Sequence, residues 1–247
     1  MKFKLEFENL KQIIKEKCKS KKVIYFPNPG NWGDGILRYA TLKLFEDIDL
    51  EYKEIGYDYD KSYDGDIAIY GAGGAWCDIH PHGRIITENL LRDGFEVIVL
   101  PSTYAYKHHI DNTIFFRRDK FESKLNIKNS IFCPDMVFYL ESENLKRKKG
   151  RGIGYFFRTD IESSNKYKIP STNYDISADG NEWSPPEPFF DEINKYSVIH
   201  TDRLHIGISA CLLGKELHLY DGAYFKNLSL YLTSVLDNFD NVYFHEE

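Results

Sequence analysis

The 247-residue sequence lacks the features that mark several specialised classes of protein. Its four cysteines are scattered and form no Cys-x-x-Cys pair, which indicates neither a zinc site nor a disulfide framework. No apolar run approaches the length that spans a bilayer, and the N-terminal segment lacks the apolar core of a signal peptide. We therefore expect a cytoplasmic protein with no transmembrane segment.

The sequence also lacks a net positive charge, because 38 Asp and Glu outnumber 32 Lys and Arg and the formal net charge is −6. Binding of a phosphate backbone normally needs a basic face, so no nucleic-acid partner is expected. The composition is otherwise that of a globular protein, with 42% hydrophobic residues, 18 Tyr and 17 Phe. An anionic ligand would require a local group of cationic side chains.

The hydrophobic pattern alternates between strands and helices along the whole chain. In the first half, apolar spacing predicts helices at 4–17, after the loop at 28–35 and near 119–126, and strands at 23–26, 66–70, 96–100 and 113–116. In the second half it predicts strands at 152–157, 173–176, 197–200, 216–220 and 241–244, and helices at 187–195, from 203 and at 228–237. The alternation predicts an α/β fold with mostly parallel sheets.

A basic stretch at 143–151 is the strongest shift of composition in the chain, and we place a lobe boundary there. The prediction is an N-terminal lobe at 1–145 and a compact C-terminal lobe at 146–247. The second lobe is small on the usual scale of domains.

The most specific local pattern is Thr-Asp-Arg-Leu-His at 201–205, where a predicted strand ends and a helix begins. Thr201 or Asp202 is expected to serve as the N-cap of that helix. Arg203 and His205 can converge on one ligand at the first turn, where backbone N–H groups also point outward. A guanidinium, an imidazole and a helix N-terminus suit a phosphate or carboxylate. The alternative is a surface arginine and an ordinary helix-start histidine.

Two glycine-containing loops follow the first two strands of the predicted sheet. In the loop Asn-Trp-Gly-Asp at 31–34, Asn31 and Asp34 either orient sugar hydroxyls and accept a proton or cap the following helix. Gly-Ala-Gly-Gly at 71–74 does not match the dinucleotide fingerprint, so it is interpreted as a close-approach turn beneath a ligand.

Other candidate groups leave alternatives open or find no support. Arg158 follows a predicted strand and is either a ligand clamp or the partner of Asp160. His80 and His82 suggest a metal, but no pattern completes a first shell, so neither a metal nor a cofactor is predicted.

Taken together in order, these motifs resemble those of the polysaccharide pyruvyl transferase family over most of the chain. The resemblance rests on the loop at 31–34, the glycine turn at 71–74, Arg-Arg-Asp at 117–119 with Ser123, and Pro-Asp-Met-Val-Phe at 134–138. It continues with Phe-Arg-Thr-Asp-Ile-Glu at 157–162, Thr-Asp-Arg-Leu-His at 201–205, and Asp221 with Tyr224 and Lys226. The chain is shorter than many members of that family.

The resemblance implies two Rossmann-like lobes similar to a GT-B arrangement, with acceptor contacts from the first lobe and phosphoenolpyruvate bound by the second. The acceptor would be a sugar or lipid-linked oligosaccharide of a surface polysaccharide, which is compatible with peripheral contact at the inner membrane face. The implied catalytic residues are His205, Arg203 and Asp34. The implied substrate-binding residues are Arg158, Arg203, Leu204, His205, Asn31, Gly73, Gly74 and Lys226.

Two rival functions remain open at the level of sequence. A GT-B glycosyltransferase would use the same cationic residues to bind the diphosphate of a nucleotide sugar. A non-catalytic homologue would keep the fold and bind a glycan or anion without turnover. No feature of the sequence specifies an oligomeric state.

Overall fold

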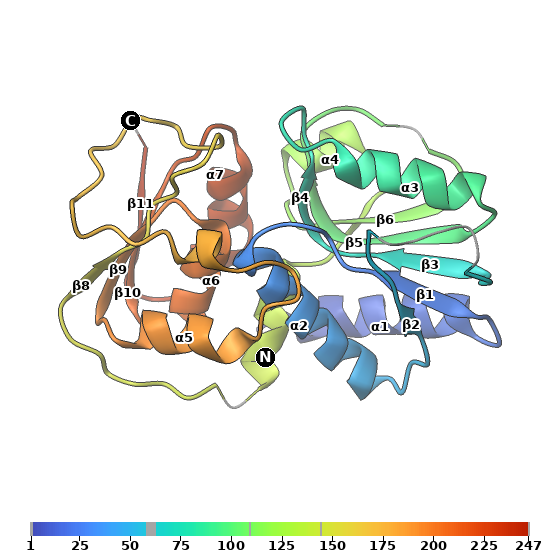
Figure 1. Ribbon diagram of the computed structural model, residues 1–247, viewed down its shortest axis with the longest axis horizontal. Coiled ribbons are helices and arrows are strands. Elements are labelled where there is room, and N and C mark those ends of the chain that lie inside the picture. The colour runs from blue at the N-terminus through green and yellow to red at the C-terminus, as the bar shows by residue number, and fades with distance from the viewer. Residues whose placement is uncertain (1, 58–62, 109, 144, 247) are drawn as a thin grey trace. The chain divides into compact units, whose positions relative to one another are not determined.

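The computed structural model describes residues 2–57, 63–108, 110–143 and 145–246. The chain forms two compact units, each with its own sheet (Figure 1). Unit 1 comprises Phe3–Pro29 and Leu37–Tyr139, and unit 2 comprises Gly30–Ile36 and Leu140–Glu247 together with Lys2. The loop at 30–36, which the sequence places in the first lobe, therefore groups with the second unit.

The sheet of unit 1 has the strand order β2-β1-β3-β5-β6-β7, and β4 pairs with β5. All of these pairs are parallel. The strands are β1 Val23–Phe26, β2 Lys53–Glu54, β3 Ile67–Tyr70, β4 Gly73–Trp76, β5 Glu96–Tyr104, β6 Thr113–Arg117 and β7 Ile131–Phe132. The parallel α/β architecture predicted from the sequence is confirmed for this unit.

Both faces of the unit 1 sheet are covered, which explains why β1 and β3 are uninterrupted apolar runs. Tyr25 contacts Phe45 on one face, with ring centroids 5.2 Å apart, whereas Ile24 belongs to a buried cluster with Ile86 and Leu90 on the other. In Figure 1, α3 lies over one face and α1 and α2 over the other.

The helices of unit 1 follow the predicted pattern with one omission. They are α1 Lys4–Cys18, α2 Trp32–Asp47, whose first turn belongs to unit 2, α3 His82–Arg92, α4 Glu122–Asn126 and the 3-10 helix η1 Met136–Ser142, which runs on into unit 2. Helix α3 is missing from the prediction, which interprets the segment around His80 and His82 as a loop. His82 instead begins the helix, and Ile86 and Leu90 form its buried stripe.

The sheet of unit 2 has the order β11-β10-β9-β8, again with parallel pairs throughout the described residues. Its strands are β8 Ile153–Tyr155, β9 Val198–Thr201, β10 Glu216–Tyr220 and β11 Val242–His245. Its helices are α5 Pro186–Asn194, α6 Leu204–Leu212 and α7 Lys226–Leu230, with the 3-10 turn η2 Ile176–Asp179 and the π-helical turn η3 Tyr231–Val235.

The strand predicted at 173–176 is wrong. Asn173, through its side chain, bonds to both backbone groups of Phe157, and η2 begins at Ile176. Side-chain hydrogen bonds of this kind compete with a regular strand ladder. The segment therefore braces the chain that leaves β8 and is not a strand of the sheet.

One face of the unit 2 sheet carries a ladder of aromatic rings. Tyr155, His200, His218 and Tyr243 occupy directly paired positions on the four strands. The two imidazoles stack with centroids 4.2 Å apart and parallel planes. Burial, followed by the nearby His218 and His245, lowers the pKa of His200 to about 4, so the His200 ring is neutral at pH 7.

Candidate anion-binding site

Two arginines follow neighbouring strands of the unit 2 sheet. Arg158 comes shortly after β8, and Arg203 lies between β9 and α6. Because β8 and β9 are parallel neighbours, their carboxyl ends meet at the same edge, where open α/β sheets bind ligands. The two side chains are only 7% and 5% exposed. Their charges therefore need partners inside the protein.

Two aspartates supply these partners. Asp160 Oδ1 accepts a hydrogen bond from Arg158 Nε at 2.8 Å, and Asp160 Oδ2 lies 2.7 Å from Arg203 Nη1. Asp175 accepts from Nε and Nη2 of Arg203 at 2.9 and 2.6 Å, a bidentate geometry. Of the alternatives left open for Arg158, pairing with Asp160 is the one the structure shows.

Glu162 extends the same network to a third cation. Lys226, at the start of α7, donates from Nζ to Glu162 Oε2 at 2.8 Å. Arg158 Nη1 contacts the same carboxylate oxygen. Three cationic side chains and three carboxylates thus form one continuous charged cluster, which we call the arginine cluster: Arg158, Arg203, Lys226, Asp160, Glu162 and Asp175.

The pairing keeps Arg158 and Asp160 ionised. Burial alone would lower the pKa of Arg158, but the carboxylates of Glu162 and Asp160 outweigh it and raise that pKa. Burial would raise the pKa of Asp160, but Arg158 and Arg203 together lower it. Arg158 and Asp160 are therefore both charged at neutral pH.

Asp175 is the member of the cluster that sequence reasoning missed. Besides Arg203 it accepts from the backbone N–H and the hydroxyl of Thr159, at 2.8 and 3.0 Å. It thereby ties the turn after Arg158 to the guanidinium of Arg203. The sequence implies only that a buried arginine needs a carboxylate partner. It does not indicate which aspartate or glutamate that partner is.

Asp202 has a different role from the predicted one. The N-cap of α6 is Arg203, so the prediction of Thr201 or Asp202 is wrong. Thr201 Oγ1 instead accepts from Arg203 N at 2.9 Å, and Asp202 Oδ1 accepts from Arg158 N at 2.8 Å. Burial raises the pKa of Asp202 to about 6, despite the opposing Arg158 N–H. A perturbed carboxyl at a strand end is typical of functional sites.

The loop at 31–34 caps α2 reciprocally. Asn31 Oδ1 accepts from Gly33 N at 2.8 Å, and Asp34 Oδ2 accepts from Asn31 N at 3.0 Å. This arrangement is a variant of the capping box, so the cap interpretation of Asn31 and Asp34 is confirmed. A role for the two side chains toward an acceptor stays a prediction.

The same loop lies against His205. A Cβ atom on Gly33 would sit less than 3.0 Å from His205 Nδ1, so only a glycine leaves room for the imidazole here. Trp32 Nε1 donates to Pro185 O at 2.9 Å, which anchors the loop to unit 2. The structure thus brings the 31–34 loop to the histidine of the 201–205 motif, two segments far apart in sequence.

Other predicted residues lie elsewhere or are enclosed. Gly73 and Gly74 belong to strand β4 of unit 1, so the prediction that they form a turn is wrong. The turn is at Gly71, where a Cβ atom would fall less than 3.0 Å from Asn28 N, as expected for a close approach of backbones. Leu204 is 5% exposed and begins the buried face of α6.

Two further motifs of unit 1 join each other. Arg118 Nη1 donates to Asp135 Oδ2 at 2.6 Å and Arg118 Nε donates to Thr103 Oγ1 at 2.8 Å. The Arg118 and Asp135 side chains are 1% and 0% exposed. Asp119 accepts from the backbone N–H of Ser123 at 3.1 Å. These residues hold the chain after β6 to the segment that leads into η1.

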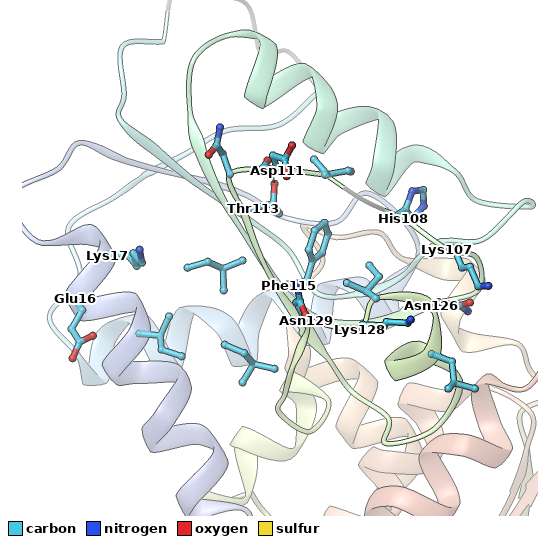
Figure 2. Close-up of a pocket in the computed structure, with 17 residues that line it drawn as sticks. Glu16, Lys17, Lys107, His108, Asp111, Thr113, Phe115, Asn126, Lys128 and Asn129 are labelled. Atoms are coloured by element: carbon cyan, nitrogen blue, oxygen red, sulfur yellow. Dashed lines mark hydrogen bonds between the residues drawn. The ribbon is translucent and has the colours of Figure 1, made fainter.

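Unit 1 contains an open cavity of about 960 Å³ between α1, the β5–β6 connection and the α4–β7 connection (Figure 2). Thr113 and Ile131, which line it, are the first residues of β6 and β7. The cavity therefore lies at the amino ends of these strands, opposite the edge where such sheets bind ligands. None of the predicted site residues lines it.

Two searches of the described residues give no further site. Residues 2–57, 63–108, 110–143 and 145–246 contain no group of three or more His, Cys, Asp or Glu side chains placed to hold a metal ion. Within the same ranges, no helix combines the length and apolar character needed to cross a membrane.

Comparison with known proteins agrees with the ordered motifs. The sequence model of the family described as polysaccharide pyruvyl transferase matches residues 31–221. The chain belongs to the polysaccharide pyruvyl transferase family. A search of curated proteins finds no match. The matched range contains Arg158, Arg203 and His205 and ends before Lys226.

A solved structure confirms the fold of this pyruvyl transferase family member. It is the crystal structure of "a functional uncharacterized protein KP1_0663" from Klebsiella pneumoniae subsp. pneumoniae NTUH-K2044. The two are 28% identical, with a TM-score of 0.82 over 100% of each chain. The compact α/β architecture with mostly parallel sheets is thus shared over the full length.

Proposed function

We propose that this protein transfers a pyruvyl group from phosphoenolpyruvate to a sugar of a surface polysaccharide or its lipid-linked precursor, with release of phosphate. The observation that carries the proposal is the meeting of Arg158 and Arg203 at the carboxyl ends of two parallel strands in a member of the pyruvyl transferase family. Guanidinium forks are suited to bind both the phosphate and the carboxylate of this donor.

The reaction balances with acid–base chemistry and no cofactor. The methylene carbon of phosphoenolpyruvate gains a proton and becomes a methyl group, and one sugar hydroxyl adds to the neighbouring carbon. A second hydroxyl of the sugar then displaces phosphate, and a cyclic ketal is formed. The two hydroxyl protons balance the proton taken up by carbon and the one carried away by the phosphate or buffer.

The residues of the site can be assigned to the steps of this reaction. Arg158 and Arg203 bind the anionic donor and stabilise charge on the leaving phosphate. His205, next to Gly33, serves as the acid–base group or the partner of the leaving phosphate. Asp34 and Asn31 are the acceptor-side groups within the same loop.

The remaining predicted contacts are Leu204, Lys226, Gly73 and Gly74. Leu204 positions the first turn of α6, and Lys226 adds a cation through the arginine cluster. The two glycines are proposed as acceptor contacts contributed by unit 1. A lipid-linked acceptor would place the reaction at the cytoplasmic face of a membrane.

The test is incubation of the protein with phosphoenolpyruvate and a panel of lipid-linked or synthetic glycosides. Phosphate release and a new ketal methyl signal in the NMR spectrum are expected to appear together with one class of glycoside. Thermal stabilisation by a sugar nucleotide but not by phosphoenolpyruvate would instead favour a glycosyltransferase. Binding of phosphoenolpyruvate without product on any acceptor would favour a non-catalytic homologue.

A further inference from the structure

Asp160 is the residue that links the two arginines of the site. Its Oδ1 atom accepts from Arg158 Nε at 2.8 Å, and its Oδ2 atom lies 3.2 Å from Arg158 Nη2 and 2.7 Å from Arg203 Nη1. Asp160 thus hydrogen-bonds to Arg158 and lies within ion-pair distance of Arg203 Nη1, a buried nitrogen that has no hydrogen-bond partner among the described residues. A substrate carboxylate or phosphate would need the same donors.

Exposure separates Asp160 from the other two carboxylates of the arginine cluster. The Asp160 side chain is 38% exposed, whereas those of Asp175 and Glu162 are each 5% exposed. Asp175 accepts hydrogen bonds from Thr159 in addition to those from Arg203. Glu162 is paired with both Arg158 and Lys226. The Asp160 side chain can therefore turn toward solvent, and each buried arginine still keeps one carboxylate partner.

The turn at Asp160 is held by hydrogen bonds from Glu162 N to Asp160 Oδ1 at 3.1 Å and from Ser163 N to Asp160 O at 3.0 Å, and only the first is lost when the side chain leaves. It lies in the irregular connection between β8 and η2, and the following Ile161 is 75% exposed. No regular strand or helix has to break for this turn to shift. The Arg158 and Arg203 side chains keep other partners, Glu162 and Asp175, when Asp160 leaves.

The charge balance points in the same direction. The three cations of the arginine cluster are matched by three carboxylates, so the cluster as a whole carries no excess of positive charge. A phosphorylated carboxylic acid brings two or three negative charges into it. Departure of one carboxylate would give the positive excess that binding of such a ligand needs.

We propose that Asp160 is an internal counter-ion that holds the place of the anionic donor and is displaced when the donor binds. The inference rests on the proposed function, since it takes phosphoenolpyruvate as that donor. Displacement makes Asp160 a specificity-determining residue. A phosphate dianion that offers several oxygens to both guanidinium groups outcompetes the carboxylate, and a simple monocarboxylate such as pyruvate does not.

The test is calorimetric titration of the folded protein with inorganic phosphate, phosphoenolpyruvate and pyruvate. Asp160→Asn and Asp160→Ala are compared with the wild type. Asp191→Asn is the matched control, because it removes an exposed carboxylate that pairs with Lys148 at 2.7 Å outside the cluster. Both Asp160 variants should bind phosphate about tenfold more tightly, equivalent to about 1.4 kcal/mol. They should also bind pyruvate detectably, and the control should match the wild type.

The outcomes separate this inference from the proposed function. Unchanged or weaker phosphate binding by both Asp160 variants overturns the counter-ion role, and turnover of phosphoenolpyruvate by the wild type would still uphold the function. Tighter phosphate binding by both variants with no turnover by the wild type upholds the counter-ion role and overturns the transferase. If Asp191→Asn binds phosphate as tightly as the Asp160 variants do, the tighter binding follows from the change in net charge. That result would also overturn the inference.

Discussion

Both units contain a buried arginine paired with an aspartate, yet the two pairs are built differently. In unit 1, Arg118 and Asp135 are 1% and 0% exposed, and their further contacts include a threonine hydroxyl and a backbone N–H. In unit 2, the Arg203–Asp175 pair is one part of a network of three cations and three carboxylates. One of those carboxylates, Asp160, reaches solvent.

The difference shows how a structural ion pair is distinguished from a candidate binding site. A pair whose two side chains are both enclosed fixes two segments of chain to each other and is closed to a ligand from solvent. A shared network with one exposed member can exchange that member for a ligand. We therefore assign a structural role to the pair in unit 1 and a binding role to the arginine cluster.

The largest effect is expected from Arg118→Ala. The substitution leaves Asp135 charged and enclosed, and the loss of one partner of a buried pair costs about 3–5 kcal/mol of unfolding free energy. Urea denaturation measures the change. Arg84→Ala, which removes a half-exposed arginine 3.7 Å from Glu88, is the control and should cost less than about 1 kcal/mol. A fully stable Arg118→Ala protein would contradict the structural assignment.

The next effect is expected from Arg203→Lys, which keeps the charge and removes the fork. Loss of a charge-assisted hydrogen bond of about 2 kcal/mol corresponds to a roughly thirtyfold fall in kcat/KM for phosphoenolpyruvate. Phosphate release measures it. Arg38→Lys removes a similar fork, the one that Arg38 forms with Glu54 in unit 1 at 2.6 Å, and should leave kcat/KM unchanged. Equal falls in kcat/KM in Arg203→Lys and Arg38→Lys would show that the arginine of unit 2 has no special role in binding phosphoenolpyruvate.

A smaller effect is expected from Gly33→Ala, which forces the His205 ring out of its place. If His205 acts in acid–base catalysis, kcat should fall about tenfold, because a displaced ring loses only part of the roughly hundredfold or more that such groups contribute. Gly222→Ala, whose Cβ atom would lie 3.6 Å from the nearest atom, serves as the control. In the His205→Ala protein, the Gly33→Ala change should cause no further fall in kcat. An additive fall in kcat would show that Gly33 does not act through His205.

The last prediction concerns the pH dependence of stability contributed by Asp202. Its pKa of about 6 in the folded protein exceeds the value of about 3.9 for an unfolded aspartate. Between pH 4 and 6 the native state therefore holds more protons, so unfolding free energy falls as the pH rises through this window.

Asp202→Asn keeps an oxygen for Arg158 N and removes this penalty. It should raise unfolding free energy at pH 7.5, by at most the roughly 3 kcal/mol that a shift of about two pKa units represents, and leave it unchanged below pH 4. Urea titrations at the two pH values measure the difference. A variant that is destabilised at pH 7.5 would show that the buried charge of Asp202 is itself required by the arginine cluster.

Much of the fold follows from local patterns in the sequence. The strands β1, β3 and β9 and the helices α1 and α6 are predictable because their apolar residues recur at the right spacing. The segment at 173–176 is not, because Asn173 and Asp175 use their side chains to bind distant backbone and guanidinium groups. Nothing local distinguishes such residues from those of a short strand.

The candidate site is predictable only in part. The position of Arg203 and His205 after a strand, and of Asn31 at the start of a helix, follows from motif and pattern. That Asp160 bridges two arginines and that Asp175 holds one of them depends on which chain segments meet in the folded unit. The sequence left two interpretations of Arg158 open for the same reason.

The most direct test of the central claim is a crystal structure of the protein with phosphoenolpyruvate. The account predicts that phosphate or carboxylate oxygens of the ligand lie within hydrogen-bonding distance of Arg158 and Arg203. Asp160 should have turned away, and the Arg118–Asp135 pair should be unchanged. Phosphoenolpyruvate bound at another place, with both arginines still paired to Asp160, would contradict the account.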